Sequence, residues 1–528
     1  MWRTALLERP PGDHRVPEDL PPRVYAPGGS RDGSREGPPR SRGAAPPPAV
    51  PGAVGAPRGR AVPGGGGGGR GGGGRGCGGS RRGGGEGRGR GRGEGGGAGR
   101  LRRAAERLLL PQGYPESVSA DYGRYQCWDG LQALCSTVTG TLSTRAVLQT
   151  VGVGDSAATA TGATLTWVLR DGLGMVTRIA FAWLQGPSLD CEAKQWRLAA
   201  DVINDVGLVL ELLAPGCGGA GPLLLGAAAM AKSAVAVAGG ATRAAVAVHQ
   251  ARRENAAEVS AKDGSQETLV NAVGLALALL LLPLLEGRPW LSWVLVALLV
   301  GAHLGCNVGA VGALRLPTLN RPRLRLALGG ALRPSPAHEP PATPPAADVI
   351  SVPGPEEVNP REPLLPGFGT RLRLHLGAPL HRLVKSEAEL RKAVECGTRD
   401  YVIVLRPSRG WVGVGLRHGA PPDAPLRACA HALLLEELLG PDLPPGAPMG
   451  AALRRLQQRL RRCPPGSVPW AAVAESSRLW DTALGPAFLR GLANAGWLTH
   501  RHQLAPDEWR LDWAGLEGGA SEDKPRPP

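Results

Sequence analysis

Charged and amide side chains recur along one stripe of an otherwise apolar segment, residues 192–213. Helical spacing places them on one face, and they are Lys194, Arg197, Asp201, Asn204 and Asp205. On this stripe Arg197 is the expected counter-charge of Asp201, one turn away, and Asp205 is the next acid. Two acids one turn apart repel each other unless a cation, a proton or a base intervenes. The stripe is either a solvated face of a soluble helix or the polar wall of a cavity in a membrane bundle that binds a small polar solute.

A second group of polar residues lies between positions 239 and 268. Its candidates for ligand binding are Arg243, His249, Gln250, Arg253, Lys262, Asp263 and Gln266. Ser265 or Asp263 also fits the N-cap of the apolar helix that follows, so capping and loop chemistry account for much of this group. Both interpretations stay open.

Two glycine-rich stretches resemble nucleotide-binding motifs but lack the required surroundings. Residues 152–157 fit GxGxxA without a βαβ pattern, and residues 226–233 resemble a Walker A motif with Ala in place of its second Gly. The nine cysteines include no CxxC pair, and no His and Cys share zinc-ligand spacing. We therefore expect no catalytic residues, no metal and no cofactor, and we expect that the protein is not an enzyme.

The elements that must hold these side chains are helices within residues 106–330. Two apolar segments, 269–285 and 290–313, are long enough to span a bilayer, and the short turn between them predicts a helical hairpin. Arginines flank both outer ends, which places them on one cytosol-like side under the positive-inside rule. The sequence predicts an integral membrane domain in contact with lipids. A buried hairpin in a large soluble helical protein is the alternative.

Further features of this domain predict its packing. Less regular apolar stretches predict additional helices at 142–169, 202–214 and 222–248. Residues 170–178 predict a charged turn, weakly similar to a loop of major-facilitator transporters. Glycines or alanines four residues apart predict faces that allow close helix packing, namely Gly301, Gly305 and Gly309, and Gly154, Ala158 and Gly162.

The ends of the chain differ in composition from this domain. Residues 1–105 are rich in Gly, Arg and Pro, carry most of the formal net charge of +16, and predict a disordered tail. An RGG-type RNA-binding tail is the alternative, but no Phe or Tyr occurs between residues 26 and 101, so we expect no nucleic-acid partner. Residues 331–369 predict a Pro-rich linker, and 516–528 a second disordered tail.

Residues 370–515 predict a small soluble α+β domain. Its expected strands are 401–405, 411–416 and 509–513, and its expected helices are 426–439, 451–462 and 480–495. The expected fold class is therefore mainly α: a helical membrane-embedded domain, a small soluble α+β domain and a disordered N-terminal tail.

Several longer motifs resemble the root UV-B sensitive (RUS) family, including its vertebrate members. They are LPQGYPESV at 110–118, YQCWD at 125–129, AKQWRLAAD at 193–201, GGATR at 239–243 and SAKDGSQET at 260–268. The resemblance covers residues 108–515. It implies a role in vitamin B6 homeostasis and UV-B protection, and it brings no established catalytic residues.

Together these features predict an integral membrane protein that binds or transports a small polar solute, such as a B6-type cofactor. The alternative is a non-transporting membrane scaffold whose C-terminal domain recruits protein partners. Other RUS proteins or a second copy of the chain are the expected protein partners.

Overall fold

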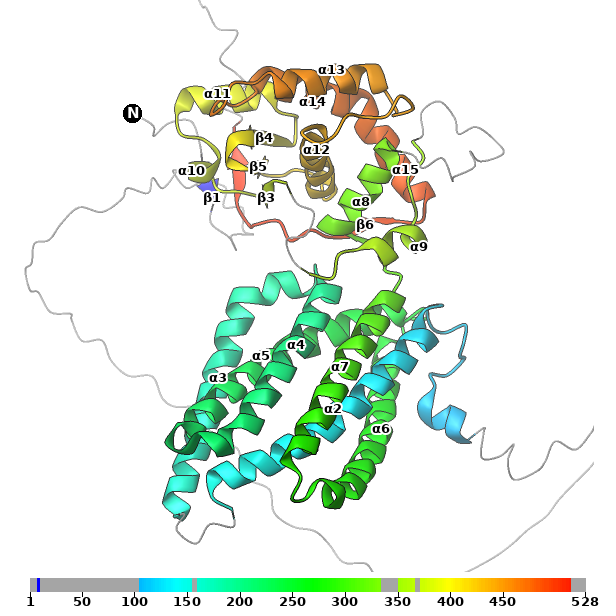
Figure 1. The fold of residues 1–528 in the computed structure, drawn as a ribbon. Coiled ribbons are helices and arrows are strands. Elements are labelled where there is room, and N and C mark those ends of the chain that lie inside the picture. The colour runs from blue at the N-terminus through cyan, green and yellow to red at the C-terminus, as the bar shows by residue number, and fades with distance from the viewer. Residues whose placement is uncertain (1–6, 10–103, 154–158, 334–349, 366–370, 514–528) are drawn as a thin grey trace, which may run out of the picture. The chain divides into compact units, whose positions relative to one another are not determined.

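The computed structural model describes residues 7–9, 104–153, 159–333, 350–365 and 371–513 (Figure 1). The predicted tails, 1–105 and 516–528, lie largely outside these residues. One difference is visible: β1 (Leu7–Arg9) pairs antiparallel with β7 (Arg510–Asp512), although the first 105 residues predict no regular structure.

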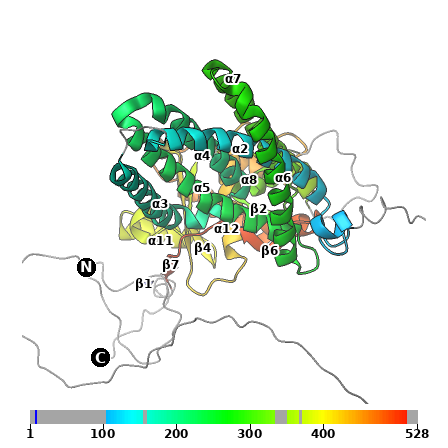
Figure 2. The same cartoon turned by 90° about the horizontal axis from the view of Figure 1, so that it is seen from below.

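Six long helices form the first half of the described chain. They are α2 (Tyr122–Val151), α3 (Ala160–Leu189), α4 (Ala193–Leu213), α5 (Gly221–Gln250), α6 (Ala256–Leu285) and α7 (Pro289–Ala313), with a 3-10 turn at Ala214–Ala220 between α4 and α5. Helix α3 packs against α5, α5 against α4, α4 against α2, and α2 against α6. Helix α7 packs against α2 and α4 (Figure 1, Figure 2). The prediction of a mainly helical protein is confirmed.

Local chemistry fixes several helix ends. The hydroxyl of Thr159 accepts the backbone N–H of Gly162 and caps α3. Proline occupies the first turn of both α5 and α7, where no backbone donor is lost. Gly152, with φ of 96°, ends α2 in a left-handed conformation that favours glycine.

Two predicted breaks do not occur. Residues 170–178 lie inside α3, and residues 260–268 lie inside α6, which begins at Ala256. The N-cap predictions for Ser265 and Asp263 are therefore wrong. The Ser265 hydroxyl donates to its own helix at the carbonyl of Ala261, and Asp263 pairs with Arg243 of α5. Charge and glycine favour a turn only when no neighbouring helix offers partners.

The hairpin of α6 and α7 has the short connection that the sequence predicts, but the two helices barely touch each other. Instead α2 packs against both. Gly274 of α6 lies against Thr137 of α2, and Gly309 of α7 lies against the Trp128 ring. A Cβ atom at Gly301 or Gly305 would meet no atom within 4 Å. Of the three glycines on the predicted face, Gly309 alone packs closely against another helix. Gly154 and Ala158 lie outside the described residues.

The second half of the described chain is an α+β region, as predicted. Strands β3 (Arg373–Leu376), β5 (Trp411–Leu416) and β4 (Tyr401–Arg406) form one sheet in that order, with β3 parallel and β4 antiparallel to β5. A second pair, β2 (Thr318–Asn320) and β6 (Leu498–Gln503), is parallel and was not predicted.

Helices surround this sheet. They are α8 (Arg321–Leu332), α9 (Pro355–Val358), α10 (Leu380–Leu383), α11 (Glu387–Cys396), α12 (Ala424–Leu438), α13 (Gly450–Arg461), α14 (Trp470–Leu479) and α15 (Gly485–Asn494), with 3-10 turns at Asn359–Arg361 and Pro407–Arg409 and a π turn at Trp480–Leu484. The predicted helix 480–495 is thus a π turn followed by α15. The region shares one large apolar core, in which α12 is buried on nearly every face.

The six long helices have the opposite pattern. Their buried apolar clusters are small, and large apolar side chains are exposed on α3, α6 and α7. Within the described residues, three helical segments are long and apolar enough to cross a membrane: Ala193–Gln250, Ala256–Leu285 and Pro289–Ala313.

Candidate functional site

A line of polar pairs follows the predicted stripe of α4. Arg197 forms an ion pair with Asp129 of α2. One turn on, Asp201 accepts hydrogen bonds from the amide groups of Gln132 and Asn307. These contacts place α4 against α2 and α7 through polar groups in the interior of the bundle.

The line continues toward the other end of α4. Asp205 lies 2.9 Å from the ring Nδ1 of His303 on α7. Glu211 then accepts from Ser143 of α2 and from Lys232 of α5. We call the set Asp129, Gln132, Arg197, Asp201, Asp205, Glu211, His303 and Asn307 the polar seam. From Arg197 to Glu211 it extends about 20 Å along the helix.

The seam corrects one expectation about pairing. The counter-charge of Arg197 is Asp129 on another helix, not Asp201 on its own. Asp201 instead faces two neutral amides, and Asn204 is partly buried but takes no part in these pairs. Adjacent helices supply closer partners than the same helix does, because their side chains point directly at α4.

Sequence reasoning missed most partners of the stripe. Asp129, Gln132 and Glu211 were not predicted, and neither were His303 and Asn307, two polar residues inside the apolar stretch 290–313. A lone polar residue in such a stretch was the available signal. Spacing within α4 could not show which other helix faces it.

Four side-chain atoms in the seam are buried without a hydrogen-bond partner among the described residues. They are Oε1 of Gln132, Oδ1 of Asn307, Nε of Arg197 and Oε1 of Glu211, and the last lies 3.6 Å from the guanidinium group of Arg170. Buried polar atoms are usually satisfied by protein or water. Three of the four atoms, two acceptors and one donor, lie around Asp201 at the centre of the seam.

Lys194 belongs to a different cluster at the start of α4. Its ammonium group donates to the carbonyl of Leu314 at 3.0 Å and to Oδ1 of Asn359 at 2.8 Å, and it lies 3.3 Å from a carboxylate oxygen of Glu362. Glu362 also accepts from Asn320 at 2.8 Å and from Arg323 at 3.2 Å. We call Lys194, Asn320, Arg323, Asn359 and Glu362 the junction cluster.

The junction cluster is a structural feature. Burial alone would raise the pKa of Glu362, but Arg323 and Lys194 hold that pKa below its ordinary value. Its carboxylate stays charged between two buried cations. Asn359 and Glu362 lie in the stretch 331–369 that predicts a linker, and residues 350–365 differ from that prediction by packing into the fold.

The second predicted group of residues lies beside a pocket of about 550 Å³ between α2, α6 and residues 105–114. Arg243 contacts Asp263 and Glu267, both at 2.5 Å. The Gln266 amide donates to the carbonyl of Leu109 at 2.6 Å, and Lys262 donates to the carbonyl of Arg107 at 2.5 Å. Asp129 of the seam also lines this pocket, so the pocket and the seam share one carboxylate.

The remaining predicted residues hold a loop in place. The His249 ring lies 2.9 Å from Asp121, which also accepts the backbone N–H of Arg315 at 2.7 Å and the hydroxyl of Ser119. Burial opposes the charge on Asp121, yet these contacts lower its pKa to about 2. The carbonyl of Gln250 accepts the N–H of Ser119 at 2.9 Å, and Arg253 is exposed. These three residues do not join the pocket.

Within the described ranges, no three His, Cys, Asp or Glu side chains gather in an arrangement that suits a metal ion. The chemistry that the seam does provide is hydrogen bonding and charge pairing in the interior of the helical bundle.

Comparison with known proteins identifies the family. A model described as "Vitamin B6 photo-protection and homoeostasis domain" matches residues 97–333, and one described as "Root UVB sensitive protein, C-terminal" matches residues 351–513. No solved structure matches.

Two curated relatives illustrate the similarity. Protein root UVB sensitive 3 of Arabidopsis thaliana is 34% identical over 80% of this chain and 89% of its own length. RUS family member 1 of Dictyostelium discoideum is 48% identical over 42% of this chain and 42% of its own length, so less than half of that protein is aligned. The chain belongs to the RUS family.

Proposed function

We propose that this RUS protein is an integral membrane protein whose helical domain binds and passes a small polar solute along the polar seam. The observation that carries the proposal is the seam itself. Its charged pairs lie between helices in the interior of the bundle, whereas the outer faces of these helices are apolar. Ionisable groups in such a domain are costly to keep and typically mark a solute or proton path.

The outer faces supply the first support. Trp183 of α3 is 80% exposed, Leu280 of α6 is 72% exposed and Leu298 of α7 is 67% exposed. In water these side chains would form apolar surface far larger than a soluble monomer usually tolerates, whereas lipid tails would cover them at no cost.

The seam supplies the second support. Its unpaired donor and acceptors lie next to Asp201, in the middle of the α2–α4–α7 contact. A solute with hydroxyl, amine or ring-nitrogen groups would complete these hydrogen bonds. Vitamin B6 compounds are small pyridines with such groups, and the matching family description names vitamin B6. We therefore assign the solute to this class.

Membrane embedding is tested first, by alkaline carbonate extraction of membranes from cells that express the full chain. We expect the protein to remain in the pellet. Its release into the supernatant would remove the basis for the whole proposal.

The solute path is tested with Asp201→Asn. Asparagine keeps an acceptor oxygen for Gln132 and Asn307 but removes the charge, so the fold should persist. Cells lacking the protein receive either variant or wild type, and their pools of pyridoxal species and their protein levels are measured. The matched control is Asp190→Asn, the same change at an exposed position after α3.

We expect Asp201→Asn to accumulate normally and fail to restore the pools, while Asp190→Asn restores them. A fall in the level of Asp201→Asn together with function would show that Asp201 serves folding. Full rescue by Asp201→Asn would overturn the solute path and favour the scaffold alternative.

A further inference from the structure

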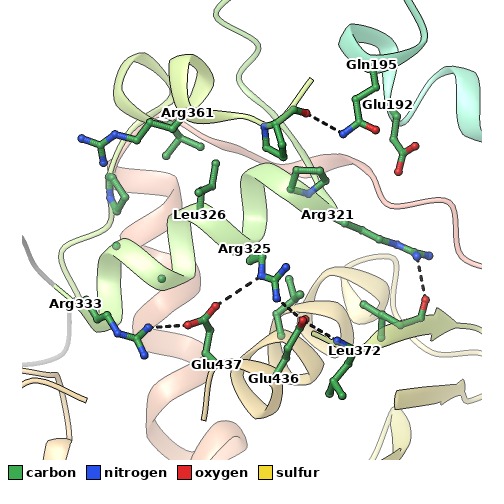
Figure 3. Close-up of a pocket in the computed structure, with 18 of the residues that line it drawn as sticks. Glu192, Gln195, Arg321, Arg325, Leu326, Arg333, Arg361, Leu372, Glu436 and Glu437 are labelled. Atoms are coloured by element: carbon green, nitrogen blue, oxygen red, sulfur yellow. Dashed lines mark hydrogen bonds and ion pairs between the residues drawn. The ribbon is translucent and has the colours of Figure 1, made fainter. Parts of the chain in front are cut away.

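A second cavity lies apart from the polar seam, beside α8 (Figure 3). Its volume is about 750 Å³, enough for a small organic molecule. Its walls come from α8, the segment 353–365, β3 and the end of α12, with Glu192 and Gln195 at the rim. We call it the arginine pocket.

One face of α8 gives the pocket its charge. Arg321, Arg325, Gly329 and Arg333 follow each other at intervals of four residues, so they share that face. A Cβ atom added at Gly329 would meet no atom within 4 Å. The helix therefore presents three guanidinium groups with open space between the last two.

Two of these arginines are held in place by acids from α12. Arg325 pairs with Glu436, and Arg333 lies 2.6 Å from Glu437 (Figure 3). Glu436 also accepts the backbone N–H groups of Arg371 and Leu372, at 2.5 and 3.0 Å. These contacts fix the positions of the two guanidinium groups before any ligand arrives, which lowers the entropic cost of binding.

The other arginines leave positive charge uncompensated. Arg321 donates to the carbonyl of Leu374 at 3.0 Å, and neither Arg321 nor Arg373 forms an ion pair with a described carboxylate. The Nη1 atom of Arg325 is buried and without a hydrogen-bond partner among the described residues. The lining includes five arginines and three glutamates, and Arg361 is paired with Glu357 outside the lining, which leaves one positive charge in excess.

The rest of the lining is apolar. Leu326, Val358, Leu372, Leu374 and Leu433 form much of the wall. A ligand that suits both parts carries a compact anionic group for the guanidinium groups and an apolar body for the leucines. Arginine binds both carboxylate and phosphate through paired N–H donors, but the larger charge and the third oxygen of a phosphate suit several guanidinium groups at once, which favours phosphate.

We propose that the arginine pocket binds a phosphate-bearing molecule with a small apolar body. Such a phosphate belongs either to a soluble metabolite or to a lipid headgroup. This site is separate from the polar seam, so its failure would leave the proposed solute path untouched, and the reverse also holds.

The test uses the full chain, purified in detergent, and isothermal titration with phenyl phosphate. Benzyl alcohol serves as the uncharged probe and inorganic phosphate as the probe without an apolar body. We expect phenyl phosphate to bind at least about tenfold more tightly than either, because only it uses both parts of the pocket.

Three variants locate the binding. Gly329→Leu fills the open space on α8 without contacting other atoms at its Cβ, and we expect it to abolish binding. Arg373→Gln removes an exposed guanidinium group that supports no ion pair, and we expect affinity to fall about tenfold. Arg391→Gln, an exposed arginine of α11 outside the pocket, should bind like wild type.

A competition arm then separates the two sources of phosphate. Nanodiscs containing phosphatidic acid that displace phenyl phosphate indicate a lipid headgroup, and nanodiscs that do not displace it indicate a soluble metabolite. Absence of phenyl phosphate binding to wild type, or equal binding by folded Gly329→Leu, would overturn the proposal. If Gly329→Leu does not fold, unchanged affinity in Arg373→Gln overturns it instead.

Discussion

The helical domain and the C-terminal α+β region distribute their apolar side chains in opposite ways. In the α+β region Leu434 is 0% exposed and Trp480 is 1% exposed, within one continuous core. In the helical domain Trp183 and Leu280 face outward, while Asp201, Asp205 and Glu211 face inward. The two regions thus place their large apolar side chains differently: in a core in the α+β region, and on the outer faces in the helical domain, as the proposed membrane embedding requires.

Their buried charges differ as well. The junction cluster places Glu362 between two cations, Lys194 and Arg323, whereas Asp201 at the centre of the seam accepts hydrogen bonds from two neutral amides. A carboxylate paired with buried cations suits a permanent structural contact. A carboxylate that faces neutral amides suits a site that exchanges partners. Four changes test the comparison between the two regions, and they follow from the largest expected effect to the smallest.

Glu362→Gln should destabilise the protein most. It leaves Lys194 and Arg323 buried without a counter-charge, which costs about 3–5 kcal/mol. The measurement is thermal unfolding of the full chain in detergent. Glu387→Gln, at an exposed helix pair with Arg391, should change stability by less than about 0.5 kcal/mol. Equal melting temperatures for the two variants would show that the junction cluster contributes little.

Leu434→Ala and Leu280→Ala compare the two apolar surfaces directly. Removing Leu434 from the packed core should cost about 2–5 kcal/mol. Removing Leu280 should have almost no effect in detergent, because its side chain has little protein around it. A large loss of thermal stability in Leu280→Ala would place the outer face of α6 in a protein contact.

Gly309→Ala tests the packing of α7 on α2. The added methyl group would lie 2.7 Å from the Trp128 ring, and relieving that contact should cost about 1–3 kcal/mol. Gly305→Ala, one turn away, meets no atom within 4 Å and should be neutral or slightly stabilising. Gly309→Ala should therefore lower the melting temperature, whereas Gly305→Ala should not, and equal melting temperatures for the two variants would argue against the close contact.

His431 makes the stability of the α+β region depend on pH. The change in stability over one pH unit is smaller than the effect expected of each of the other three changes. Burial lowers its pKa to about 3, and its ring lies between Ser476 at 3.0 Å and the Tyr401 hydroxyl at 3.3 Å. Its stabilising contribution is complete above the unfolded pKa near 6.5 and is lost as the pH falls toward 3, by at most about 1.4 kcal/mol per unit.

Hydrogen exchange of α12 amides in the full chain, corrected for intrinsic rates, measures this loss between pH 6.5 and 4.5. His431→Phe keeps the stacking on Trp480 but cannot take up a proton, so its profile should be flatter than that of wild type. Parallel profiles would mean that another group controls the pH dependence.

The sequence was informative where one segment determines its own structure. Periodicity and apolar length predicted α4, α5, α6 and α7, and alternation around the turn at 407–410 predicted β4 and β5. The charged stretch 170–178 misled, because Gly172 and Arg170 fit inside a helix when α5 packs alongside. The strands β2 and β6 are too short and too far apart to have been paired from pattern alone.

The same reasoning predicted only some of the residues of the candidate site. The spacing of residues within a single helix identified Arg197, Asp201 and Asp205 as a stripe. It could not supply Asp129 or His303, because contacts between helices depend on tertiary packing. It also grouped Lys194 with the stripe, although the Lys194 side chain reaches toward Asn359 and Glu362.

The residues of the junction cluster are also synthesised at very different times, because they lie far apart in the sequence. Lys194 enters the growing chain 165 residues before Asn359, which accepts its hydrogen bonds. At about 5–20 residues per second, the ribosome needs roughly 10–30 s to make that stretch. α4 through α7 are synthesised during this interval, in which the ammonium group of Lys194 has neither Asn359 nor Glu362. The N-terminal end of α4 therefore acquires its last contacts only after the six long helices have been synthesised.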